Sequence, residues 1–208
     1  MESASDPLLT PEDVAETYTH ETDPVQTLHQ YRKAKQLRAD NPDRSRASIA
    51  REVNRPPSAV RGWLVEDKRP VVVKAIDQAK ERGLLPLYPD DRVFPAINHL
   101  VAWIFAGGSI IGETFVPTFS IDKVNHQPIL AQALSTLELD CELVRREEYD
   151  DRLDAGLEAR SQPGPIVGRI LHALGAPRGK KTGQSYSLPS YLNQIPARHQ
   201  RAFARVYL

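Results

Sequence analysis

Basic residues recur between positions 44 and 69, where they suit contact with the phosphates of a nucleic acid. Lysine and arginine neutralise phosphate oxygens and place a protein on a duplex without reading its sequence. An arginine in this stretch could also donate two hydrogen bonds to one guanine. The chemistry that these residue types could do is binding of a polyanion. The candidate phosphate contacts are Arg46, Arg51, Arg55, Lys68 and Arg69.

Two short helices joined by a tight turn would position these side chains. Ala50 is small enough for two helices to touch, and Asn54 tolerates the left-handed backbone of such a turn better than most residues. A second helix is predicted over residues 57–65, since Pro57 is acceptable in a first turn. The residues expected to form the inner core of the pair are Ile49, Ala50, Val53, Val60 and Trp63.

Residues 44–64 resemble a helix-turn-helix DNA-binding unit at these core and turn positions. In such units the second helix enters the major groove with its N-terminal residues near the base edges. Ser58 and Arg61, the second and fifth residues of the predicted helix, are then the candidate base-reading residues. The alternative is a three-helix unit that makes only protein contacts, with its arginines on solvated faces.

The other residue types that could do chemistry show no catalytic or metal-binding spacing. The six histidines are scattered along the chain, and a single cysteine excludes an internal disulfide. The sequence has no glycine-rich phosphate loop, nucleophile elbow or paired-cysteine motif. We therefore expect no metal ion and no cofactor.

The formal net charge of zero is a cancellation between blocks. Residues 1–30 carry −7, residues 31–90 carry +6, residues 91–160 carry −6 and residues 161–208 carry +7. Two basic blocks can suit a polyanionic partner, and the alternative is a mixed surface with the blocks folded against each other. The chain has neither an apolar run of membrane-spanning length nor a signal-like N-terminus, so we expect a cytoplasmic protein without membrane contact.

Helix and turn signals predict an α+β protein with four segments. Residues 1–22 form an acidic segment with a short helix, which begins after Thr10. Residues 23–84 form the all-α helix-turn-helix domain, residues 85–94 a linker, and residues 95–208 a second domain. In that domain strands are expected at 115–121, 140–148 and 152–159, and helices at 128–137 and 165–174. Pro117 predicts an edge or a bend in the first of these strands.

Residues 97–112 resemble the signature helix of the LAGLIDADG homing endonucleases, in which a helix rich in small residues runs into an acid followed by glycine. Here the helix is followed by Gly107, Gly108 and Ser109, so that Gly107 falls on the position of the metal-binding acid. The run at 174–182 and the segment at 187–189 also resemble that family. The alternative for Gly107 is a small residue at a tight helix crossing.

The resemblance implies an α-β-β-α-β-β-α fold whose cutting chemistry is lost with the acid. It also implies basic residues near the phosphates, for which Arg178, Lys180 and Lys181 are candidates. Residues 196–208 resemble the start of a second signature helix, so we expect one full repeat and the beginning of another. This last helix would pack on 97–106, or two copies of 97–106 would meet in a homodimer.

The chain is similar in kind to the WhiA-like regulators, which join the same two parts in the opposite order. That resemblance implies a sequence-specific DNA-binding protein that regulates transcription and does not cut. The alternative is a LAGLIDADG-type endonuclease that acts as a homodimer or with a partner and requires Mg²⁺. A third hypothesis is a decayed remnant that folds but has no role on DNA.

Overall fold

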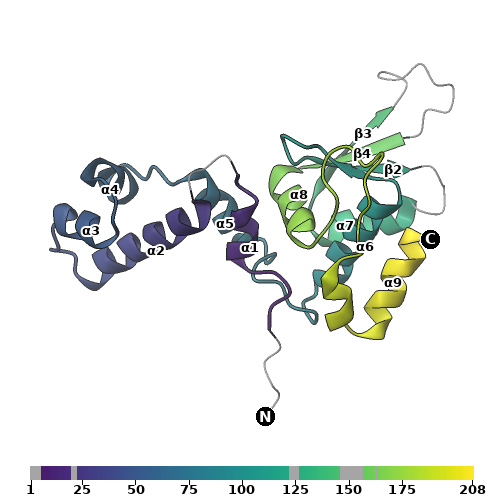
Figure 1. Cartoon of the computed structure of the whole chain (residues 1–208), viewed down its shortest axis with the longest axis horizontal. Helices are drawn as coiled ribbons and strands as arrows, with labels where there is room; N and C mark the ends of the chain where they lie inside the picture. The colour runs from purple at the N-terminus through teal and green to yellow at the C-terminus, as the bar shows by residue number, and fades with distance from the viewer. Residues whose placement is uncertain (1–5, 20–22, 122–126, 146–156, 163) are drawn as a thin grey trace, which may run out of the picture. The chain divides into compact units, whose positions relative to one another are not determined.

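The computed structural model describes residues 6–19, 23–121, 127–145, 157–162 and 164–208 (Figure 1). The chain divides into two compact units. One is Pro11–Glu81, and the other combines Met1–Thr10 with Arg82–Leu208. The described part of the first unit is helical and the second contains helices and a sheet, so the fold belongs to the α+β class.

Five helices build the first unit, and residues with good capping chemistry begin two of them. The helices are α1 (Pro11–Glu16), α2 (Pro24–Asp40), α3 (Arg46–Glu52), α4 (Pro57–Leu64) and α5 (Val71–Glu81). The Asp23 carboxylate accepts a hydrogen bond from the Gln26 amide at 2.8 Å, at the start of α2. The Ser45 hydroxyl does the same for the Ser48 amide at 3.2 Å, at the start of α3.

One hydrophobic core joins these helices. Tyr31 of α2 meets Trp63 of α4 edge to face, with 5.6 Å between the ring centroids. Val14 and Ala15 of α1 are buried and α1 contacts α2 and α5, so it belongs to this unit and not to a separate segment 1–22. The other buried core residues of the unit include Leu28, Ala34, Ile49, Ala50, Val53, Val60, Val72, Val73 and Ile76.

The second unit places helices around a four-stranded antiparallel sheet in the order β1-β2-β4-β3. Its longest described helix, α6, packs against α7, α8 and α9 as well as against β2. Leu100, Val101 and Ile104 of α6 are fully buried. The elements in chain order are α6 (Phe94–Ala106), β1 (Ser109–Ile110), β2 (Pro117–Ile121), α7 (Gln127–Thr136), β3 (Asp140–Arg145), β4 (Leu157–Gln162), α8 (Gly164–Ala173), η3 (Ser190–Gln194) and α9 (Ala197–Tyr207).

The strand predicted at 115–121 begins later, and the difference has a local cause. Phe115 has a φ of 58°, and its amide donates to the Ile111 carbonyl at 2.9 Å, so it belongs to a turn. Pro117 pairs with Ile110 of β1, whereas pairing with β4 starts only at Thr118. Proline is thus tolerated at the first residue of β2, although β2 lies between two other strands.

Gly168 allows α8 to approach this turn closely. A Cβ atom added at Gly168 would lie 1.8 Å from the carbonyl oxygen of Phe115. The ring of Phe115 is buried, and the Arg169 and Arg178 guanidinium carbons lie 3.8 and 4.4 Å from its centroid. The absence of a side chain at Gly168 therefore sets the contact between α8 and the segment before β2.

The other helices and strands predicted for residues 95–208 differ from the structure mainly in where they begin and end. The predicted helices at 128–137 and 165–174 correspond to α7 and α8. The predicted strands at 140–148 and 152–159 overlap β3 and β4, while 146–148 and 152–156 lie outside the described residues. The expected linker at 85–94 is not free: Leu85 and Leu87 are buried, and Leu87 bridges to Leu9.

Candidate nucleic-acid interface

The turn between α3 and α4 has the geometry that its sequence predicts. Asn54 adopts a left-handed conformation with a φ of 51°. The Arg55 amide donates to the Ala50 carbonyl at 3.0 Å and closes the end of α3. Ile49, Ala50, Val53, Val60 and Trp63 are all buried, as expected for the inner side of the two helices. The outer side of α4 is therefore fixed relative to α3.

Ser58 and Arg61, the candidate base-reading residues, are exposed on α4. They are three residues apart, so they share one face of the helix. The Arg61 side chain is 65% accessible, which leaves most of its guanidinium open to an incoming molecule. The structure thus brings the two residues together on the solvent side of α4.

Glu66 holds two of the candidate basic residues. Its Oε1 atom lies 3.0 Å from Nε of Arg61, and its Oε2 atom lies 2.8 Å from Nζ of Lys68. Hydrogen bonding and charge attraction from Lys68, followed by the charge of Arg61, keep the pKa of the Glu66 carboxyl below its ordinary value. The carboxylate is therefore ionised at neutral pH. The sequence analysis did not single out Glu66, which lies just beyond the end of α4.

The candidate phosphate contacts of α3 and of the turn that follows it differ in what they touch. Arg46 and Arg51 are exposed, and neither has an ion pair or hydrogen bond from its side chain within the described part of the chain. Arg55 is half-buried and donates to Gln30 Oε1 at 2.5 Å and to Thr27 Oγ1 at 2.6 Å. Arg55 thus ties the turn to α2, whereas Arg46 and Arg51 remain available to phosphates.

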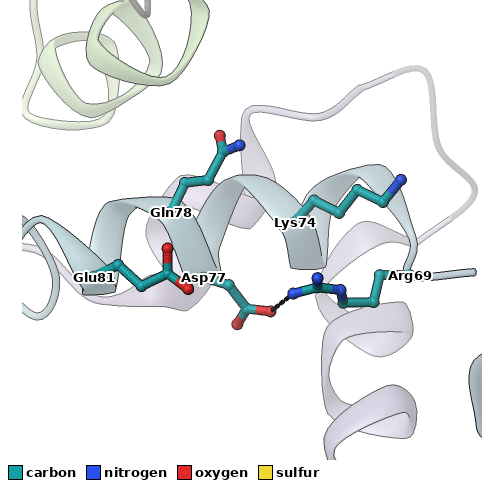
Figure 2. Close-up of a pocket in the computed structure, with 5 residues that line it drawn as sticks. All are labelled: Arg69, Lys74, Asp77, Gln78 and Glu81. Carbon is teal, nitrogen blue, oxygen red and sulfur yellow. Dashed lines mark hydrogen bonds and ion pairs between the residues drawn. The ribbon is translucent and has the colours of Figure 1, made fainter. Parts of the chain in front are cut away.

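Arg69 is neutralised within the protein. It pairs with Asp77 at 3.4 Å and with Asp67 at 3.7 Å. Arg69 lines a pocket of about 200 Å³ together with four residues of α5. Figure 2 shows its guanidinium directed at Asp77. The lining carries both charges, since it contains Lys74 and Glu81 as well. This mixed lining does not resemble a phosphate site, and Arg69 is a weaker phosphate candidate than Arg46 or Arg51.

Gly107 ends α6 at an exposed position. Its carbonyl oxygen accepts a hydrogen bond from the Ser120 hydroxyl at 2.8 Å. A Cβ atom at Gly107 would meet only the Ser120 Cβ, at the ordinary contact distance of 3.7 Å. The space beside the Gly107 Cα would therefore accept a Cβ atom, so close packing does not require glycine here.

The three basic candidates of the second unit also have different surroundings. Lys181 donates from Nζ to the Ile104 carbonyl in the last turn of α6, and burial lowers the pKa of this lysine. Arg178 lies over the Phe115 ring. Lys180 is exposed. Of the three, Lys180 has the side chain most open to a phosphate, while Lys181 stabilises the end of α6.

Helix α9 covers the apolar side of α6. The Phe105 ring lies 6.1 Å from that of Phe203 and 6.3 Å from that of Tyr207. The buried Asn98 amide donates to the His199 carbonyl at 3.0 Å and accepts from the Tyr191 hydroxyl at 2.8 Å. Of the two arrangements expected for 97–106, packing of the last helix or pairing of two copies in a homodimer, the structure has the first.

The described residues contain no group of three or more acids, histidines or cysteines placed to hold a metal ion. None of the described helices combines the length and the apolar character needed to cross a membrane. Comparisons with protein-family models, curated proteins and solved structures gave no significant match. We therefore derive a function from the residues and geometry of the chain.

Proposed function

We propose that the protein binds double-stranded DNA in a sequence-specific manner, through α3 and α4, and regulates transcription. The observation that carries this proposal is the exposure of Ser58 and Arg61 on α4, which the left-handed turn at Asn54 joins to α3. A short helix that exposes Ser58 and Arg61 after such a turn suits insertion of α4 into a major groove. Arg46 and Arg51 on α3 would contact the phosphates beside that groove.

Charge around the two helices supports the same proposal. Residues 44–69 contain seven basic and three acidic residues, so this stretch has a net charge of +4. Glu52 and Glu66, two of the three acids, each pair with two cations. The positive field that remains would attract the phosphate backbone and make binding dependent on salt concentration.

For the second unit we propose a LAGLIDADG-like domain that no longer cuts DNA. Support comes from the order α6-β1-β2-α7-β3-β4-α8 and from Gly107 at the end of α6. Helix α9 would occupy the place where a second signature helix meets the first. In this proposal the domain stabilises the protein and adds at most peripheral phosphate contacts, with Lys180 the best candidate.

The test is a selection of bound sequences from random duplex DNA with the full chain, followed by titration of the selected site. We expect a defined site, and we expect Arg61→Ala to weaken binding by about 1–3 kcal/mol while relaxing preference at one base position. Arg46→Ala should weaken binding to all sequences about equally and lower the salt dependence by about one counterion.

Arg92→Ala is the matched control, because Arg92 is an exposed arginine in the acidic block of the second unit. It should leave both affinity and base preference unchanged. Failure to select any sequence, or equal effects of the Arg61 and Arg92 substitutions, would contradict the proposal and favour a protein-contact role for α3 and α4.

A further inference from the structure

Glu66 divides its two carboxylate oxygens between two cations. Oε1 faces Nε of Arg61 at 3.0 Å, and Oε2 faces Nζ of Lys68 at 2.8 Å. Arg61 and Lys68 are well exposed, at 65% and 75% of their side-chain areas, whereas Glu66 is at 33%. Glu66 thus holds Arg61 by one edge of its guanidinium and leaves the rest of that group in solvent.

The edge that Glu66 occupies limits how Arg61 can bind a base. A guanidinium has one N–H on Nε and two on each terminal nitrogen. It reads guanine by donating two parallel hydrogen bonds to O6 and N7. With Nε engaged by Glu66, the two terminal nitrogens remain, and no other described residue pairs with the Arg61 side chain. Those terminal nitrogens form a fork directed away from Glu66.

We propose that Glu66 is a specificity-determining positioning residue, which orients Arg61 so that its two terminal nitrogens meet one guanine. This inference rests on the proposed DNA-binding function. An arginine on an exposed helix otherwise samples many rotamers, and only some of them present the fork. Because exposed ion pairs add little to folding stability, the effect of Glu66 falls on base preference and not on the fold.

The chain offers a matched control in Glu52. Its carboxylate also pairs with two cations, Arg44 and Lys33, and its side chain is 35% accessible. Neither cation lies on α4. Glu52→Gln and Glu66→Gln therefore remove the same charge from similar double ion pairs, and only the second weakens the hold on Arg61, because an amide oxygen accepts a weaker hydrogen bond than a carboxylate.

The experiment measures binding of the full chain to the selected site and to three variants of it, in which the guanine read by Arg61 is replaced by each other base. We expect Glu66→Gln to lower the preference for guanine about two- to fivefold, the range that an exposed ion pair can contribute. Both glutamine variants should bind nonspecific DNA as tightly as the wild type or more tightly, because a negative charge near phosphates is removed. Glu52→Gln should leave the guanine preference unchanged.

Two further variants separate orientation from charge. Glu66→Asp keeps the charge but shortens the side chain, so it should lower guanine preference without raising nonspecific affinity. In an Arg61→Ala background, Glu66→Gln should cause no further loss of preference, because the pair acts as a unit. Circular dichroism and thermal unfolding of each variant would verify that the fold is retained.

Equal guanine preference in the Glu66→Gln and Glu52→Gln proteins would overturn the positioning role of Glu66. Additive losses in the double variant would also overturn it. A different outcome, in which the wild type selects no site or Arg61→Ala leaves every base preference intact, would refute DNA reading by α4 itself. The two failures are therefore distinguishable.

Discussion

The guanidinium of Arg55 is held by two neutral oxygens, while those of Arg46 and Arg51 extend from α3 into solvent. Arg55 therefore stabilises the turn, whereas Arg46 and Arg51 remain free to contact a ligand, although all three side chains have the same chemistry. Arg61 is intermediate, since one edge is engaged by Glu66 and the remainder is open. The role of each arginine thus depends on which protein oxygens accept hydrogen bonds from its guanidinium.

Gly168 provides a test of packing at the scale of one residue. Gly168→Ala would place a methyl group 1.8 Å from the Phe115 carbonyl oxygen, so the backbone must move. We expect the free energy of unfolding of the second unit to fall by about 2–3 kcal/mol, the upper part of the range for overpacking. Urea unfolding followed by Trp103 fluorescence measures this in a Trp63→Phe background, since the chain has two tryptophans, one in each unit.

Gly112→Ala is the control for that substitution. A Cβ atom there would meet only the Gly179 Cα, at 3.8 Å. Its unfolding midpoint should match that of the parent protein. If Gly168→Ala and Gly112→Ala unfold alike, the close approach of α8 to Phe115 is not a feature of the protein in solution.

At the scale of elements, the packing of α9 on α6 encloses two histidines. Burial, followed by the charge of His199, lowers the pKa of His99. Burial, followed by the nearby Arg198, lowers the pKa of His199, which Asp90 opposes. Both groups are therefore neutral in the folded unit near neutral pH. On unfolding they regain the ordinary pKa of about 6.5 and bind protons more readily.

This difference predicts that the second unit loses stability as the pH falls. The stabilisation is complete above about pH 6.5, the ordinary pKa, and decreases as the pH falls toward the lowered values of the folded state. Urea midpoints measured between about pH 7 and 5 should decrease, and His99→Gln should flatten the curve. His29→Gln should not, because His29 is exposed and lies in the other unit. A flat wild-type curve would contradict the prediction.

The sequence predicted those elements whose residues act locally. Asn54 and the buried residues of α3 and α4 were predictable, because a turn conformation and a helix face each depend on neighbours a few positions away. The structural role of Arg55 was not, since its partners Thr27 and Gln30 lie on a different helix. Strand β1 was implied by the resemblance but could not be located, because two residues show no alternation and only pairing with β2 defines them.

The domain borders show the same limit at longer range. The segment 85–94 was predicted to be a linker because it contains prolines and acids. The backbone of Leu87 nevertheless pairs with Leu9, which is far away in sequence. Within the candidate site, exposure of Ser58 and Arg61 followed from helix periodicity. Their connection to Glu66 did not, because that contact extends past the end of α4 into irregular chain.

At the scale of the whole molecule, the charge blocks fall differently on the two units. The basic stretch at 44–69 lies on the helical unit, while the acidic block at 91–160 and the basic block at 161–208 share the other. The helical unit also holds five acids of the block at 1–30, so charges of both signs partly cancel within each unit in the field felt by a distant polyanion. The local stretch at 44–69, and not the net charge of either unit, is therefore the feature that we expect to attract DNA first.

The endonuclease alternative predicts metal-dependent cutting of DNA, whereas the proposed non-cutting domain predicts none. Incubation of the full chain with supercoiled plasmid and Mg²⁺ should leave the plasmid intact, because Gly107 supplies no oxygen ligand from its side chain. Electrophoresis with and without a chelator measures this. Metal-dependent cutting that disappears in Glu113→Gln or Asp122→Asn protein would overturn the proposal of a non-cutting domain.

The amide of Asn98 has a consequence for how α9 can attach. Its two hydrogen-bonding ends are both satisfied in a fully buried position, one by a carbonyl of α9 and one by a hydroxyl of η3. A slide of α9 by one residue would leave the amide without its acceptor, at a cost of about 1–3 kcal/mol. Positions of α9 shifted along α6 are therefore higher in free energy. We expect α9 to pack on α6 in a single register or to detach as a whole.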